Sequence, residues 1–312
     1  MGTEVPRLEG IFPPIPTPFD ASGDIDLAAL AENLDWWNRF DLTGFVVLGS
    51  NGEAALLDET EKLRLVDSAR AALSEDRSLI VGTGLPSTRA TIVLTRAVAD
   101  AGADFALVLP PSYYKGQMTA EALVRHYHAV ADASPVPIIL YNMPACTGID
   151  LAAETIARIA QHSNIIGIKD SGGNVVKAGE IRRLVGPEFG VLAGSASFLL
   201  PALSLGAVGG VLALANIAPA QCLAIYQHFL NGEWEQAREI QARMIPVNTA
   251  VTRGWGVPAL KAAMDMLGLY GGPVRPPLLP LSAELKTQLE KVLVEGDILV
   301  TREVKEERGV TR

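Results

Sequence analysis

Eight short apolar runs recur along the chain, and they constrain its fold more than any other feature. Between them lie segments with helical periodicity, such as Leu27, Leu30 and Leu34, which recur at steps of three and four. The runs span 11–15, 45–48, 79–81, 105–109, 138–141, 165–169, 191–193 and 211–213. Near-continuous apolar strands joined by helices are typical of buried parallel sheets. Eight even units favour closure into a (β/α)8 TIM barrel over the alternative, a doubly wound open sheet.

After residue 213 only helical patterns follow, over 220–230, 233–249, 257–267 and 283–294. The last three predict a small C-terminal helical appendage. We therefore expect a catalytic barrel domain over 1–230, a helical region over 231–300, and a tail over 301–312. That tail is charged and poor in apolar residues, so we expect it to be disordered.

Composition excludes several classes of partner. The chain has 312 residues and a net charge of −9, without the basic cluster of a nucleic-acid-binding protein. Residues 189–232 lack charged side chains but are divided by glycines and prolines, so we interpret them as buried interior and expect no membrane span. Two distant cysteines and a start without a signal-peptide pattern favour a reducing cytoplasm.

Lys169 closes the sixth apolar run, where a chain rarely places an ammonium group. Desolvation disfavours the charged form of an amine, and a neutral amine can attack a carbonyl to form a Schiff base. The ordinary alternative is that Lys169 reaches solvent or pairs with Asp170. Taken alone, that alternative is the commoner one for a lysine at a strand end.

The residues at the other strand ends favour the reactive interpretation of Lys169, because functional groups of such barrels follow the carboxyl ends of the strands. After the second strand, Ser50 and Glu53 have capping-box spacing, and the same helix start could hold a carboxylate. Tyr141 ends the fifth strand, so its phenol could shuttle protons beside Lys169 if strands five and six are neighbours. Tyr113 and Tyr114 follow Pro-Pro, and this pair has a packed loop as its alternative.

Metal and nucleotide chemistry lack support in the sequence. Of four histidines only His126 and His128 are close, and on a helix this spacing directs them to different faces. Neither a phosphate loop nor a G-x-G-x-x-G turn occurs. Cys146 has no evident partner for nucleophilic work, so we interpret it as a packed or lining residue.

In combination, these motifs resemble the dihydrodipicolinate synthase/N-acetylneuraminate lyase family, which consists of pyruvate-dependent, Schiff-base-forming aldolases on a (β/α)8 barrel. The likeness covers about residues 8–295. It rests on Thr17-Pro18-Phe19, Gly49-Ser50-Asn51-Gly52-Glu53, Tyr113-Tyr114, Tyr141-Asn142-Met143-Pro144 with Thr147-Gly148, and Gly167-Ile168-Lys169-Asp170-Ser171.

The resemblance implies a role for each matching residue. Lys169 would form the imine, which replaces any metal or organic cofactor, and Tyr141 would be the acid/base phenol. Ser50 and Asn51 would hold the pyruvyl carboxylate, with Ser50 also relaying protons. Tyr114 would reach into a neighbouring subunit's site, as in a homotetramer built from two dimers. The remaining candidate substrate contacts are Ser171, Gly194, Ser195 and Val211.

Departures from the pattern bear on the substrate. Dihydrodipicolinate synthases usually carry Thr-Thr at Ser50-Asn51 and a carboxylate-binding arginine at Cys146, whose donors a thiol cannot replace. The chain looks closer to 4-hydroxy-2-oxoglutarate aldolases, although Asn142 stands where those often have serine. We therefore expect cleavage of a 4-hydroxy-2-oxo acid to pyruvate and an aldehyde such as glyoxylate. The alternatives are a dihydrodipicolinate synthase, a 2-keto-3-deoxy-sugar-acid aldolase or dehydratase, and a non-catalytic 2-oxo-acid-binding protein.

Overall fold

The computed structural model of the chain describes residues 8–299. The tail expected over 301–312 lies outside these residues. Eight parallel strands form one sheet in which neighbours along the chain are neighbours in space, and β1 also pairs with β8. The strands are β1 (Gly10–Phe12), β2 (Gly44–Val47), β3 (Ser78–Gly82), β4 (Phe105–Val108), β5 (Ile138–Asn142), β6 (Ile165–Asp170), β7 (Gly190–Ala193) and β8 (Gly209–Val211).

A parallel bridge between Pro14 and Val46 joins the continuation of β1 to β2 and brings the two ends of the sheet together. The predicted (β/α)8 barrel is therefore confirmed, and the open sheet is excluded, because the first strand pairs with the last. The prediction for the eighth strand was wrong by two residues. It begins at Gly209, where any side chain would collide with the backbone oxygen of Gly10, so glycine is needed there for the close approach of β1.

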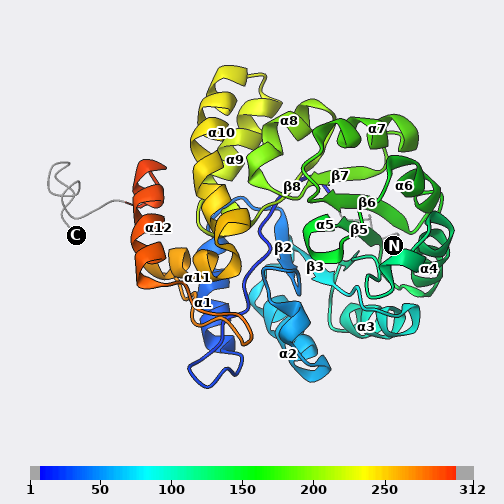
Figure 1. Ribbon diagram of the computed structural model, residues 1–312, viewed down its shortest axis with the longest axis horizontal. Helices are drawn as coiled ribbons and strands as arrows, with labels where there is room; N and C mark the ends of the chain where they lie inside the picture. Colours follow the sequence, from blue (N-terminus) through cyan, green and yellow to red (C-terminus); the bar gives the residue numbers. More distant parts are fainter. Residues whose placement is uncertain (1–7, 300–312) are drawn as a thin grey trace, which may run out of the picture.

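Helices alternate with the strands and surround the barrel, while α10 to α12 lie at one side (Figure 1). Ser, Thr, Asp or Asn caps the N-terminus of six helices, including the expected capping box of Asp58 and Glu61 at α2. The helices are α1 (Leu27–Trp37), α2 (Glu59–Ala72), α3 (Thr88–Asp100), α4 (Ala120–Ala133), α5 (Pro144–Thr147), α6 (Ala153–Ile159), α7 (Val175–Val185), α8 (Leu199–Ser204), α9 (Pro219–Leu230), α10 (Trp234–Thr249), α11 (Gly256–Met266) and α12 (Ala283–Glu295).

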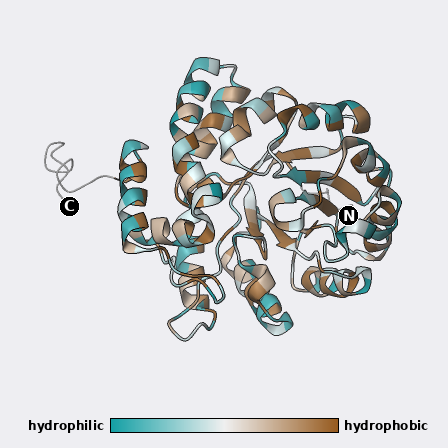
Figure 2. Cartoon of the chain, in the orientation of Figure 1, coloured by the Kyte–Doolittle hydropathy of each residue, from teal (hydrophilic) through white to brown (hydrophobic). Residues whose placement is uncertain are grey.

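Apolar side chains fill two separate layers. One cluster lies inside the barrel and includes Phe12, Phe105, Ile139 and Leu192, while a larger one lies between the strands and the helices. Because successive side chains of a strand point to opposite faces, each strand contributes to both layers. Figure 2 shows the result as apolar strands inside helices whose outer faces are hydrophilic.

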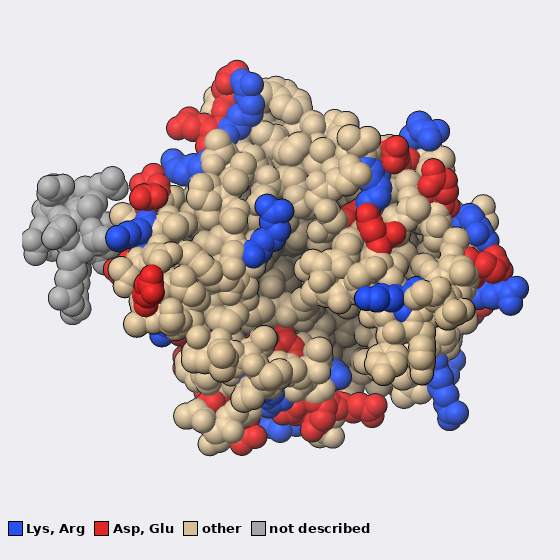
Figure 3. Space-filling model, in the orientation of Figure 1, with Lys and Arg blue, Asp and Glu red and all other residues tan. Residues whose placement is uncertain are grey.

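The uncharged stretch 189–232 forms β7, α8, β8 and α9. Its two strands are buried as expected, whereas Leu205 after α8 and Leu230 at the end of α9 are 41% and 57% exposed. No helix within residues 8–299 is long and apolar enough to cross a membrane. On the face seen in Figure 3, acidic and basic side chains are scattered and do not gather into a basic patch.

Candidate active site

Lys169 and Tyr141 lie side by side near the carboxyl ends of β6 and β5. The two residues are partners in the parallel register, and the Lys169 Nζ lies 3.9 Å from the centre of the Tyr141 ring. The lysine is only 3% exposed, and no carboxylate of the described chain lies within 4.0 Å of its Nζ. The alternative in which Lys169 reaches solvent or pairs with Asp170 is therefore wrong.

Ser50 completes a polar cluster with this pair. Its Oγ lies 3.3 Å from the Tyr141 hydroxyl, so a proton can pass between the two oxygens. Ser50 and the following Asn51 are half-buried at the end of β2, and no described residue makes a hydrogen bond with the Asn51 side chain. The Asn51 amide is therefore available as a donor to a ligand carboxylate.

The capping box expected for Ser50 and Glu53 is not formed. Glu53 has a left-handed backbone conformation with φ of 53°, and its side chain makes no cap. Instead its carboxylate lies 2.6 Å from the Nζ of Lys261 in α11 and accepts a hydrogen bond of 2.8 Å from the Arg275 N–H. Burial lowers the pKa of Lys261, and Glu53 opposes that shift. The Lys261 ammonium group and the Arg275 backbone N–H both come from the C-terminal region, so the loop that carries Ser50 is fixed from outside the barrel.

A cavity of about 550 Å³ opens beside Ser50 and Tyr141. It lies against the ends of β2, β3 and β4, and exposed Cys146 stands at its edge. Its lining is predominantly apolar and includes Leu48, Leu85, Leu107, Leu109 and Leu278. A molecule much larger than pyruvate can therefore be accommodated beside Ser50 and Tyr141, whereas Lys169 lies behind the Tyr141 ring and is not among the lining residues.

The other candidate residues fall into two groups. Ser171 and Gly194 meet at the ends of β6 and β7, with the Ser171 hydroxyl 3.4 Å from the Gly194 carbonyl oxygen, and Val211 is buried inside the barrel. The Ser195 hydroxyl accepts a 2.9 Å hydrogen bond from Asn248 of α10, a contact that the sequence did not reveal. Tyr114 is 70% exposed and packs edge-on against Tyr113, so its hydroxyl is not part of this chain's own cluster.

His126 and His128 make hydrogen bonds outside the Lys169–Tyr141 cluster. His126 Nδ1 lies 2.9 Å from the Thr88 hydroxyl, whereas His128 Nε2 lies 3.1 Å from the Ile159 carbonyl oxygen, so the two rings diverge as expected. Within residues 8–299, no group of three or more His, Cys, Asp or Glu side chains gathers as a metal ion would require.

Comparison with known proteins identifies relatives over nearly the whole chain. Residues 7–295 match the dihydrodipicolinate synthetase family. A probable mitochondrial 4-hydroxy-2-oxoglutarate aldolase of Emericella nidulans is 37% identical over 93% of this chain and 96% of its own length. A 4-hydroxy-tetrahydrodipicolinate synthase of Methanothrix thermoacetophila is 36% identical over 92% of this chain and 97% of its own.

Among solved structures, a dihydrodipicolinate synthase of Bacillus anthracis superposes with a TM-score of 0.89. It is 30% identical and covers 92% of this chain and 98% of its own. A dihydrodipicolinate synthase of Cyanidioschyzon merolae, solved with lysine bound, also gives a TM-score of 0.89 at 29% identity, over 93% of this chain and 99% of its own. The chain therefore belongs to the dihydrodipicolinate synthetase family and is a class I lyase built on a (β/α)8 barrel.

Proposed function

We propose that the protein reversibly cleaves a 4-hydroxy-2-oxo acid, such as 4-hydroxy-2-oxoglutarate, to pyruvate and an aldehyde such as glyoxylate. The observation that carries this proposal is the buried Lys169 amine, 3.9 Å from the Tyr141 ring and without a carboxylate partner within the described chain. A purely binding protein would have no need of such an amine beside a phenol. The non-catalytic alternative is therefore the weaker one.

In the cleavage direction, the neutral Lys169 amine attacks the C2 carbonyl carbon and gives a carbinolamine. Loss of water then yields an imine, whose cation draws the electron pair of the breaking C3–C4 bond toward nitrogen. Tyr141 gives its phenolic proton to the hydroxyl group that leaves the carbinolamine as water, and the resulting phenolate, with Ser50 within 3.3 Å, then takes the proton of the 4-hydroxyl group as the aldehyde forms. The remaining enamine is protonated at C3, and water releases pyruvate and restores the amine.

The rest of the site holds the substrate in this scheme. Ser50 and Asn51 bind the C1 carboxylate, and the ends of β6, β7 and β8 border the pyruvyl group through Ser171, Gly194, Ser195 and Val211. The protonated imine polarises the substrate as a metal ion would in other lyases, so we propose that the reaction needs no metal or organic cofactor.

Cys146 supports the choice of substrate. A carboxylate-binding arginine is missing at the edge of the cavity, and the thiol offers no bidentate donor set for the carboxylate of aspartate semialdehyde. The 37% identity to a probable 4-hydroxy-2-oxoglutarate aldolase favours the same substrate. Relatives at 36% identity are dihydrodipicolinate synthases, and so that activity remains the alternative, together with cleavage or dehydration of a 2-keto-3-deoxy-sugar acid.

We further propose a homotetramer assembled from two dimers. Tyr113 and Tyr114 are highly exposed aromatic side chains, at 80% and 70%, and such residues are typical of subunit interfaces. In the dimer, Tyr114 would enter the partner subunit's site. Both cysteines are free thiols, which supports a location in the reducing cytoplasm.

The deciding experiment compares cleavage of 4-hydroxy-2-oxoglutarate with cleavage of 2-keto-3-deoxy-gluconate, and with condensation of pyruvate and aspartate semialdehyde. Borohydride is added in parallel with pyruvate, and the protein mass is measured. We expect a reduced pyruvyl adduct on Lys169, its absence from Lys169→Ala, and the fastest turnover with 4-hydroxy-2-oxoglutarate. An unchanged mass in the wild type would contradict the imine mechanism and favour a binding protein.

A further inference from the structure

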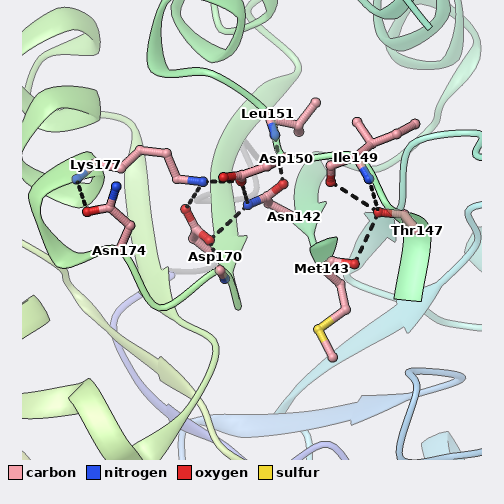
Figure 4. Close-up of polar contacts among 10 residues, drawn as sticks. Asn142, Met143, Thr147, Ile149, Asp150, Leu151, Asp170, Asn174 and Lys177 are labelled. Carbon is pink, nitrogen blue, oxygen red and sulfur yellow. Dashed lines mark hydrogen bonds and ion pairs between the residues drawn. The ribbon is translucent and has the colours of Figure 1, made fainter. Parts of the chain in front are cut away.

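A second polar cluster lies directly behind the Lys169–Tyr141 pair. On β5 and β6 the residues that follow this pair, Asn142 and Asp170, are themselves partners in the register. Because side chains alternate along a strand, Asn142 and Asp170 point out of the barrel interior, toward the helices. Figure 4 shows these two side chains converging on Lys177 and Asp150, which come from outside the sheet.

Asn142 is completely buried and joins the members of this cluster. Its amide nitrogen donates to Asp150 Oδ1 at 2.7 Å and to Asp170 Oδ1 at 3.0 Å. Its amide oxygen accepts a 2.9 Å hydrogen bond from the Leu151 N–H. Every polar atom of the amide is therefore used, and two carboxylates are held next to each other. Such an arrangement requires a nearby cation, since like charges repel in a buried site.

Lys177 supplies that cation from the first turn of α7. Its side chain is 6% exposed, and its Nζ lies 3.0 Å from Asp170 Oδ2 and also pairs with Asp150. Asp170 Oδ1 accepts a further 2.7 Å hydrogen bond from the Gly172 N–H. Both oxygens of Asp170 are thus engaged on the helix side of β6, away from the adjacent Lys169.

This engagement has a chemical consequence for the neighbouring residue. A buried carboxylate needs a compensating cation. If Lys177 were absent, the uncompensated charge of Asp170 would act across β6 on the adjacent Lys169, although the two side chains point to opposite faces of the strand. A carboxylate close to an amine favours its charged form, which cannot attack a carbonyl.

We propose that Lys177 is a positioning residue for the lyase reaction. The strand geometry already directs Asp170 to the helix side of β6; by compensating its charge there, Lys177 weakens the attraction of this carboxylate for the ammonium form of Lys169 and so lowers the pH at which the amine reacts with a 2-oxo acid. The inference rests on the proposed imine chemistry of Lys169.

The charged and titratable side chains around this pair come from four elements. The neighbouring strand β7 contributes only Leu192 and Ala193 in register with Lys169 and Asp170, and neither titrates. Burial would raise the pKa of Asp150, but hydrogen bonds from Lys177 and Asn142 hold it below its ordinary value, so Asp150 is charged at neutral pH. The titratable groups concerned are Tyr141 on β5, Lys169 and Asp170 on β6, Asp150 between α5 and α6, and Lys177 on α7.

The test measures the initial rate at which pyruvate and cyanoborohydride modify the full-length protein, followed by intact mass from mildly acidic to mildly alkaline pH. In Lys177→Met, Asp170 loses its cation, and we expect the midpoint of the rate profile to move up by about one pH unit. In Asp170→Asn, Lys177 loses one of its two carboxylates, and we expect the midpoint to move down. General damage to the fold would lower the rate at every pH and would not move the two midpoints in opposite directions.

Two further variants serve as controls. Lys177→Arg keeps the positive charge and should retain the wild-type midpoint, while Arg183→Met removes an exposed cation from the same helix and should leave it unchanged. Wild-type midpoints in both Lys177→Met and Asp170→Asn would overturn the inference. If Lys177→Met does not fold, a midpoint in Asp170→Asn at or above the wild-type value overturns it. A wild type that forms no adduct would instead contradict the proposed function.

Discussion

Replacing Lys261 by methionine removes the ion pair that joins α11 to the loop after β2, together with the 2.8 Å hydrogen bond from the Lys261 Nζ to the Pro273 carbonyl oxygen. The Lys261 and Glu53 side chains are each 1% exposed, and their charged atoms lie 2.6 Å apart. Methionine has a similar apolar stem, but it removes the charged Nζ, which lies 4.5 Å from the centre of the Phe19 ring. The Glu53 carboxylate would then remain buried with only the Arg275 N–H as a donor. Breaking one side of a buried pair costs about 3–5 kcal/mol.

The expected decrease in the free energy of unfolding is measured by urea unfolding of the full chain. Lys286→Met, which removes an exposed lysine, is the control. The double variant Glu53→Gln with Lys261→Met should recover part of the stability, because no unpaired charge stays buried. Since Glu53 follows Ser50 by three residues, we also expect a higher KM for pyruvate in Lys261→Met. A loss below about 1 kcal/mol, as for an exposed pair, would refute the reasoning, and so would a double variant no more stable than the single one.

Three other predictions concern the site and the fold. Tyr141→Phe should slow cleavage by about 10²- to 10⁴-fold, because the proton acceptor is lost; a near-normal rate would remove its assigned role. Cys146→Arg should raise the use of aspartate semialdehyde, and an unchanged rate would show that the missing arginine does not decide selectivity. Burial lowers the pKa of His126 to about 4 from 6.5, so the unfolded chain binds the extra proton between these values. Stability should therefore fall as pH drops from 6.5 toward 4, by up to about 3 kcal/mol, and His126→Gln should lose that part of the pH dependence.

The barrel could be predicted because its signal is local and repeated. Each strand is a short apolar run, and each helix between them has its own period and cap, so eight units suffice to indicate closure. The placement of Lys169 beside Tyr141 follows from the same rule, since successive parallel strands are neighbours. Their register does not follow, because β5 and β6 have an irregularity at Ile138–Ile139 that shifts the pairing by one residue.

The contacts that fix the site could not be predicted, because they join residues distant in sequence. Glu53 has capping-box spacing with Ser50, and only the fold shows that Lys261, some two hundred positions later, takes its carboxylate. Ser195 contacts Asn248 for the same reason. The eighth strand was misplaced because paired glycines are typical of turns. Here they allow two strands to approach closely.

Burial alone does not distinguish a reactive lysine in this protein, whereas charge pairing separates Lys169 from Lys177 and Lys261. Lys62 is 9% exposed and also has no ion pair within the described chain, but it lies in α2 and not at the end of a strand. Lys261, Lys169 and Lys177 are 1%, 3% and 5% exposed. Lys261 pairs with Glu53, and Lys177 pairs with Asp170 and Asp150, so their ammonium forms are compensated. Of these three, only the Lys169 amine can give up a proton without leaving a buried carboxylate unpaired, because it contacts the Tyr141 ring and no carboxylate. Peptide mapping after reduction with pyruvate should therefore find the adduct on Lys169 and on neither of the other two; comparable labelling of Lys177 or Lys261 would mean that pairing does not select the nucleophile.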